Sequence, residues 1–176
     1  MTIDQLNDEG LLKRVILFDN WERVGDEPEQ DYMGQPRLIS YQLRTDNEVT
    51  LNFYYRGTLL HPNIAKEFLL LVSKPPHQLS SEEQESMSLV LRDAAYKEYF
   101  EMGAVRTEIL RERTVLVAEG KWVASGLMNL GIFFNADKHA EVIQEIHYLA
   151  PPGKFEKHIG EAVASMTSID WDKIGK

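Results

Sequence analysis

The sequence of 176 residues contains no cysteine. This absence excludes disulfides, thiolate metal ligands and thiol nucleophiles, and it fits a reducing compartment. Long apolar runs are also missing: the longest, Phe68 to Val72, is far too short to cross a bilayer. The first nine residues are acidic and lack an apolar core, so we predict no secretory signal. We therefore expect a soluble, cytoplasmic protein that does not bind membranes.

Positive charge is scarce. The chain has 19 lysine and arginine residues against 28 acidic ones, which gives a formal net charge of −9. Such a surface repels phosphate backbones, so we predict no nucleic-acid binding. Acidity favours solubility in general, and it would also attract a basic protein partner.

Motifs for phosphate, metal and acyl-transfer chemistry are absent as well. No glycine-rich loop ends in Lys-Ser or Lys-Thr, and Ser125-Gly126 is not part of a Gly-x-Ser-x-Gly pattern. The histidines are too widely spaced for the short-range ligand pairs of zinc sites; they are His61, His77, His139, His147 and His158. We therefore predict no cofactor and no metal site.

The composition is otherwise that of an ordinary globular protein, with 43% hydrophobic and 27% charged residues. The length suits one domain, which we place over residues 1–176. Residues 1–14 are expected to form an N-terminal arm or a short helix with Ile3, Leu6 and Leu11 facing inward. Gly10 weakens such a helix.

Alternation of apolar and polar residues predicts most of the secondary structure as strands. The clearest hairpin joins residues 38–43 and 49–55 through the turn formers at 45–48. Further strands are predicted over 15–18, 105–110, 114–119, 130–134 and 142–149.

Three segments favour helices. Residues 64–72 are predicted as a helix with Asn63 as the N-cap, although a strand over 68–72 is an alternative. Ser80 and Glu83 have capping-box spacing at the start of a helix whose apolar stripe runs to residue 95. Phe155 to Met166 has the helical spacing of a closing C-terminal helix. These elements predict an α+β fold: a mainly antiparallel sheet flanked by helices on one face or both. An uncovered edge strand would favour an oligomer.

The order of these elements resembles the PsbP-like superfamily, which includes the Ran-binding Mog proteins and the DcrB group. The resemblance starts with the short strand Val15 to Phe18 followed by Trp21, and continues through the hairpin at 106–119. It ends with the helix introduced by Ala150-Pro151-Pro152-Gly153-Lys154-Phe155, and so spans most of residues 15–171. The resemblance implies a sheet packed between helices and non-enzymatic roles in assembly, chaperoning or partner binding. It implies no catalytic residues.

Glu145 and His147 are the candidate catalytic pair. Strand alternation places both on one face of the strand 142–149, where a carboxylate could orient the imidazole as a general base. Arg106 and Glu108 are expected on a nearby strand with the same orientation. A solvated sheet face with weak charge pairs is the alternative that the pattern favours, because such pairs are common on half-exposed sheets.

Tyr54, Arg56 and Trp122 are the candidate binding residues. If helices cover both faces of the sheet, the aromatic residues all belong to the core. If one face is open, Tyr54 and Trp122 could line a groove for an apolar peptide or a small ligand. Arg56 could anchor a partner's carboxylate, or cap the local hairpin.

The sequence thus favours a non-enzymatic module that binds a protein partner or assists assembly. One alternative is a small enzyme that uses Glu145 and His147. Another is an immunity-type protein whose acidic surface masks a basic partner.

Overall fold

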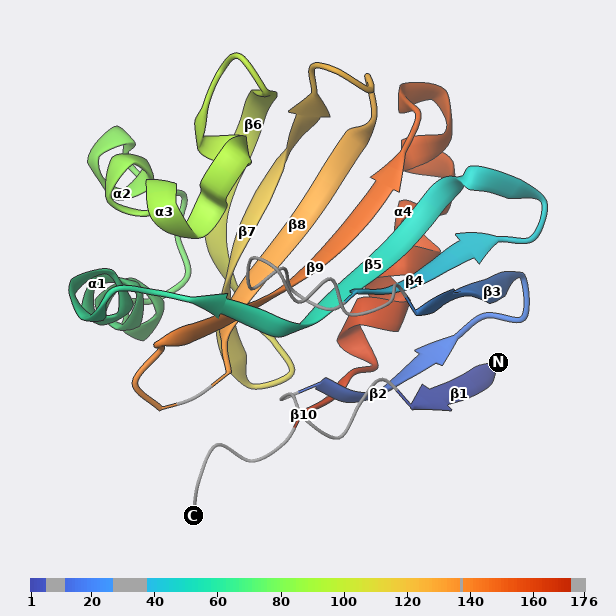
Figure 1. Cartoon of the computed structure of the whole chain (residues 1–176), viewed down its shortest axis with the longest axis horizontal. Coiled ribbons are helices and arrows are strands. Elements are labelled where there is room, and N and C mark those ends of the chain that lie inside the picture. Colours follow the sequence, from blue (N-terminus) through green and yellow to red (C-terminus); the bar gives the residue numbers. More distant parts are fainter. Residues whose placement is uncertain (6–11, 27–37, 137, 172–176) are drawn as a thin grey trace.

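A seven-stranded antiparallel sheet forms the centre of the molecule, in the order β3-β4-β5-β9-β8-β7-β6 (Figure 1). The computed structural model describes residues 1–5, 12–26, 38–136 and 138–171. The strands of this sheet are β3 (Trp21–Asp26), β4 (Leu38–Leu43), β5 (Asp46–Leu59), β6 (Phe100–Leu110), β7 (Arg113–Trp122), β8 (Met128–Asn135) and β9 (Val142–Ala150). A smaller sheet consists of β1 (Thr2–Gln5), β2 (Leu12–Leu17) and β10 (Asp170–Trp171).

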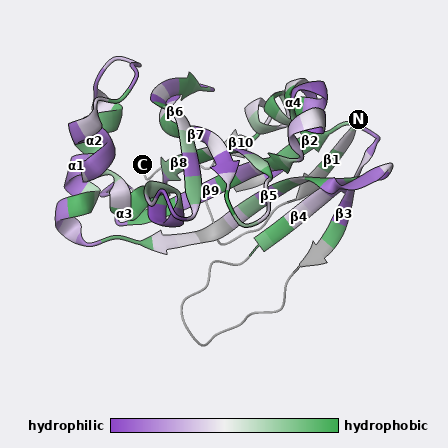
Figure 2. Ribbon diagram, turned by 90° about the horizontal axis from the view of Figure 1, so that it is seen from above, coloured by the Kyte–Doolittle hydropathy of each residue, from purple (hydrophilic) through white to green (hydrophobic). Residues whose placement is uncertain are grey.

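Helices lie on both faces of the large sheet. They are α1 (Pro62–Ser73), α2 (Ser81–Ser86), α3 (Ser88–Leu91), the 3-10 helix η1 (Arg92–Ala95) and α4 (Pro152–Thr167). We call the face against α4 the back and the face against α1–α3 the front; seen from above, the two groups lie on different sides of the sheet (Figure 2). This arrangement confirms the predicted α+β fold with a closing C-terminal helix.

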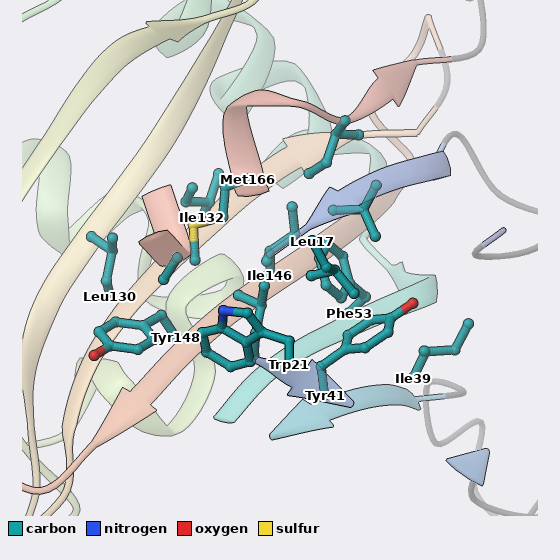
Figure 3. Packing of buried hydrophobic residues seen from close by; sticks show 14 of the residues in the cluster. Leu17, Trp21, Ile39, Tyr41, Phe53, Leu130, Ile132, Ile146, Tyr148 and Met166 are labelled. Atoms are coloured by element: carbon teal, nitrogen blue, oxygen red, sulfur yellow. The ribbon is translucent and has the colours of Figure 1, made fainter. Parts of the chain in front are cut away.

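The back face carries the larger core, because alternate residues of each strand point to it. Ile39, Tyr41 and Phe53 are at most 1% exposed there, and the ring centroids of Tyr41 and Phe53 lie 5.7 Å apart in an edge-to-face contact (Figure 3). Helix α4 closes this core with one apolar face that includes Phe155 and Met166.

The front face is covered only in part. Residues of α1 and α3, such as Phe68 and Leu91, pack with Leu116 and Phe133 of β7 and β8. On β5 and β4 the front-facing positions are mostly polar and half-buried; they are Thr50, Asn52, Tyr54, Ser40 and Gln42. Helical cover therefore ends near β9.

The N-terminal helix expected within residues 1–14 is wrong where the chain is described. Residues 2–5 form β1, which pairs antiparallel with β2 through Thr2–Leu17 and Gln5–Arg14. Val15 and Leu17 are buried by this arrangement. A strand pairing satisfies the backbone and buries these side chains, whereas an isolated short helix containing a glycine would bury little. Residues 6–11 lie outside the described ranges.

The middle of the chain is helical as predicted, with two corrections. Residues 64–72 are in a helix, but its N-cap is His61, whose Nδ1 accepts from the Asn63 backbone N–H at 3.4 Å. The Ser80–Glu83 capping box is present. The helix that follows does not continue to residue 95, because the chain breaks at Met87 and again at Arg92, whose φ of 56° no α-helix accommodates.

One edge of the sheet is partly paired. The Leu79 N–H donates to the Val105 carbonyl and the Thr107 N–H donates to the His77 carbonyl, both at 2.9 Å. The oligomer expected through an edge strand stays a prediction. Within the described ranges, no helix has the length and apolar character needed to cross a membrane.

Candidate functional site

A pocket of about 390 Å³ opens on the front face where the helical cover ends. Its floor comes from β9 and β8, its two sides from β5 and β7, and the rest from the end of α3, from η1 and from the turn between β7 and β8. The lining residues are Tyr54, Leu91, Arg92, Asp93, Ala94, Trp122, Ser125, Leu127, Asn129, Glu145, His147 and Leu149.

Strand register explains why these side chains meet. Glu145 is paired with Tyr54 on β5, and Leu149 is paired with Asn129 on β8, so all four side chains point to the front. Trp122 ends β7, three strands away from Tyr54 in the sheet order. Trp122 is also six residues along β7 from Leu116, the residue of β7 in the row of Tyr54. At about 4.8 Å per strand and 3.3 Å per residue, the backbones of the two aromatic residues stand roughly 24 Å apart, at opposite ends of the floor.

His147 is the centre of a hydrogen-bonded group on the floor. Its Nε2 lies 2.9 Å from Glu145 Oε2, and its Nδ1 lies 3.0 Å from Asn129 Oδ1. The ring also meets Tyr54 and Phe133 edge-to-face, each with centroids 5.6 Å apart. Glu145 is only 6% exposed and Asn129 only 2%. The alternative that the pattern favoured, a solvated sheet face, is therefore wrong for Glu145 and His147.

Both ring nitrogens of His147 are engaged by the protein. An imidazolium would donate to the Glu145 carboxylate and to the Asn129 carbonyl oxygen. A neutral ring with its proton on Nε2 would still donate to Glu145, and would accept from the Asn129 amide after that amide turned over. In either form, no ring nitrogen remains for a substrate.

Two glycines make room for the rings of the site. A Cβ on Gly131 would lie 3.1 Å from the His147 ring, so this glycine lets the imidazole lie close against β8. A Cβ on Gly120 would lie 2.6 Å from Phe100 Cζ and closer still to the Glu101 carbonyl oxygen. Phe100 in turn packs edge-to-face on Trp122, with centroids 4.7 Å apart. The missing side chain at Gly120 thus leaves room for the Phe100 ring, which in turn positions Trp122.

Arg92 reaches into the site from the front. Its Nη1 lies 3.5 Å from Glu145 Oε1 and 3.4 Å from Thr58 Oγ1, and its side chain is 42% exposed. Its backbone adopts φ 56° and ψ −128°, a conformation that residues with a Cβ rarely adopt. Strain of this kind tends to occur at functional sites.

The pocket brings together four of the five candidate residues. Tyr54, Trp122, Glu145 and His147 all line it, whereas the side chain of Arg56 lies outside the described part of the structure. Their function stays a prediction.

The expectation for Arg106 and Glu108 is wrong. Thr107 lies in the row of Glu145, so its two neighbours point to the back face. There Arg106 binds Glu108 at 2.9 Å and Glu119 at 2.7 Å.

Sequence reasoning missed Arg92 and Asn129. Asn129 sits one residue outside the strand predicted over 130–134, and Arg92 is not part of the apolar stripe of the helix predicted to residue 95. Among the described residues, no three histidine or acidic side chains come together as metal ligands would.

No protein-family model matches the sequence, and no curated protein matches it either. Among solved structures, the solution structure of cyanobacterial PsbP (CyanoP) from Synechocystis sp. PCC 6803 is similar, with a TM-score of 0.62. The alignment covers 97% of this chain and 92% of that one. The chain has a PsbP-like fold. Sequence identity is only 7%, so the PsbP-like likeness concerns the fold and not the residues of the pocket.

Proposed function

We propose that the protein is a non-enzymatic module that binds a segment of a partner protein in the pocket between Tyr54 and Trp122. The observation that carries this proposal is the pocket itself: aromatic side chains on two sides, leucines around them and a few fixed polar groups on the floor. Sites of this composition and of about 300 Å³ or more are typical of binding.

Acid–base catalysis receives less support from the same geometry. Glu145 and His147 do meet in a concave site, as an enzyme would require. A general base, however, needs a nitrogen that can reach the proton it removes, and both nitrogens of His147 face protein groups. The Ser125 hydroxyl already accepts from the Leu127 N–H at 3.3 Å. The hydrogen-bonded side chains of Glu145, His147 and Asn129 therefore suit a role as part of the binding surface better than a role in proton transfer.

Masking of a basic partner receives no support from the described acidic side chains. Several of them are already paired with lysines, including Glu83 with Lys74, and Asp46 and Glu48 with Lys154. The PsbP-like fold is compatible with a non-enzymatic module and favours neither of the alternatives.

Affinity capture from native lysate with matched variants tests the proposal. Trp122→Ala and Tyr54→Ala each remove one side of the pocket, whereas Val123→Ala trims an exposed neighbour that does not line it. We expect a partner that is retained by the wild type and by Val123→Ala, and lost with both pocket variants. Thermal unfolding confirms that each variant is folded. A partner retained equally by all four proteins would refute this use of the pocket.

A further inference from the structure

We propose that strand β6 is an interaction edge for a second copy of this chain, and that His77 controls access to it. Strand β6 ends the strand order of the large sheet, so one of its long sides has no neighbour among the described strands. A strap formed by residues 77–79, between α1 and α2, covers part of that side. The residues involved do not line the pocket, so this inference does not rest on the proposed function.

Hydrogen bonds along the backbone fix the strap on β6. The Leu79 N–H donates to the Val105 carbonyl at 2.9 Å. The Thr107 N–H donates to the His77 carbonyl, also at 2.9 Å, and the Thr107 hydroxyl accepts from the His77 N–H at 3.1 Å. Val105 and Thr107 therefore direct their outward backbone groups to the strap. Ile109, two residues further along β6, points its backbone groups in the same direction, and its side chain is 63% exposed.

The imidazole of His77 lies between two acceptors at the start of the strap. Its Nδ1 is 2.8 Å from the Pro75 carbonyl oxygen, and its Nε2 is 3.1 Å and 3.2 Å from the carboxylate oxygens of Glu83. Neither group can donate a hydrogen bond, so a ring protonated on both nitrogens satisfies both. Strand β6 contributes the neutral Thr107 hydroxyl, which could donate to a neutral ring but lies at a longer 3.4 Å from Nδ1. The arrangement therefore favours the imidazolium.

Charged groups from two helices act on this ring. Glu83 belongs to α2 and Lys74 follows α1, and Lys74 Nζ lies 2.6 Å from Glu83 Oε1. Hydrogen bonds, first of all from Lys74 and then from the Ser80 N–H, lower the pKa of Glu83 to about 2, so it stays ionised near neutral pH. Hydrogen bonds to the Pro75 carbonyl and to Glu83 raise the pKa of His77 above 6.5, against the charge of Lys74. The imidazolium therefore holds the strap fully below pH 6.5, and this hold is lost as pH rises through the raised pKa.

Without the strap, the edge of β6 is complementary to itself. The five residues from Val105 to Ile109 read Val-Arg-Thr-Glu-Ile. When two copies meet antiparallel at Thr107, Val105 faces Ile109 of the second copy, and their outward backbone groups exchange hydrogen bonds. Arg106 in the same way faces Glu108 of the second copy, so that opposite charges meet. A parallel pairing in register would place like charges side by side, so the charges select the antiparallel, twofold arrangement.

Three features oppose the pairing and limit its strength. Leu79 of the strap is only 6% exposed, because it packs with residues of α1 and α3, and opening the strap uncovers it. Each copy carries a net charge of −9, so the two copies repel each other except where salt screens them. Arg106 already contacts Glu108 and Glu119 of its own chain, so charge decides the direction of pairing more than its strength. We therefore expect a dimer only where the hold of His77 is lost.

Sedimentation equilibrium of the full chain tests the pairing, at about 0.15 M salt and between about pH 5.5 and about pH 8.5. If loss of the imidazolium makes each strap about threefold easier to open, the dissociation constant of the dimer should fall about tenfold over this range, because the dimer opens two straps. His77→Gln should remove this pH dependence. His158→Gln, on α4, is the matched control and should keep the pH dependence of the wild type.

Substitutions at the two edges of the sheet locate the interface. Ile109→Lys places a charge on the edge of β6, a device by which natural edge strands avoid pairing, and should abolish the dimer at every pH. Val24→Lys makes the same change at a 50% exposed position of β3, at the opposite end of the strand order, and should leave the dimer unchanged.

Amide hydrogen exchange reports the opening of the strap directly. The protection factors of the Leu79 and Thr107 N–H groups, which are corrected for the intrinsic effect of pH on exchange, should fall about threefold as pH rises in the wild type. In His77→Gln they should stay constant. Without the pH dependence, His77 would be a structural residue of the strap and not its control.

Three results would overturn the inference. Absence of a dimer both from the wild type at the highest pH and from His77→Gln would exclude a second copy as the partner. A dimer that Ile109→Lys leaves intact would place the contact on another surface. Protection factors at Leu79 and Thr107 that do not change with pH would remove His77 from its role. Each of these results leaves the pocket untouched, so the proposed function stands or falls separately.

Discussion

The same substitution, glycine to alanine, should have opposite effects at two positions of this fold. At Gly160, in the middle of α4, an added Cβ meets nothing within 4 Å. At Gly120, on β7 two residues before Trp122, the added Cβ would collide with the Phe100 ring and with the Glu101 carbonyl oxygen. The substitution removes the same backbone freedom from the unfolded chain at both positions, so the difference reports the space in the folded state.

The expected magnitudes follow from these surroundings. Gly160→Ala should raise the free energy of unfolding by about 1 kcal/mol, the helix-propensity difference between the two residues. Gly120→Ala should lower it by about 2–3 kcal/mol, the upper part of the range for overpacking, because a backbone carbonyl cannot move aside as a flexible side chain does. For a chain of this size, Tm should rise by roughly 2–4 °C in the first case and fall by roughly 5–10 °C in the second.

Urea unfolding followed by circular dichroism measures both changes, and the slope with denaturant shows whether the two-state analysis holds. Gly131→Ala gives an internal check, because its Cβ would meet the movable His147 ring at 3.1 Å. We expect a loss smaller than that of Gly120→Ala. A Gly120→Ala variant as stable as the wild type would refute the close packing of Phe100 on β7, and with it our account of how Trp122 is positioned.

Three further predictions concern the scaffold. Glu112 has φ 69° in the β6–β7 turn, so Glu112→Gly should raise the free energy of unfolding by up to about 1 kcal/mol in urea titrations. Hydrogen bonds to the Pro75 carbonyl and to Glu83 raise the pKa of His77 above 6.5. Its stabilising effect is therefore full below pH 6.5 and is lost as pH rises through the raised pKa, so the Tm gap between wild type and His77→Gln should shrink with rising pH. The buried Tyr148 hydroxyl donates to the Phe155 carbonyl at 2.9 Å, and Tyr148→Phe should cost about 0.5–1.5 kcal/mol on unfolding.

Local patterns were sufficient to predict the strands with one buried face, such as β4, whereas β1, β3 and β10 were not predicted. On β4, buried and half-buried residues alternate without exception, and the tight turn at Arg111 and Glu112 follows from the two flanking strands. The broken helix after Ser80 was not predictable in this way. Its apolar residues have helical spacing throughout. The breaks at Met87 and Arg92 depend instead on how the chain packs across the front of the sheet, which the spacing does not contain.

The candidate site was predictable in its residues but not in its burial. Alternation on β9 placed Glu145 and His147 on one face, and the register across β5 and β8 then decided what lay beside them. That register depends on pairings between distant segments, which spacing within one strand does not contain. Arg92 could not be found from sequence because its role depends on a φ of 56° at a break between two helices.

The polar group on the floor of the pocket gives one more prediction, which separates function from folding. Glu145→Met alone would leave His147 and Arg92 facing an apolar side chain, and we expect a loss of about 1–3 kcal/mol. Replacing the whole group with Glu145→Met, His147→Leu and Asn129→Leu removes every buried partner at once. Such replacements are often neutral or stabilising in other proteins, so the triple variant should be at least as stable as Glu145→Met while it loses the partner that the wild type captures. A triple variant that is less stable than Glu145→Met would show that the fold itself requires this hydrogen-bonded group, and the group would then be no argument for a binding site.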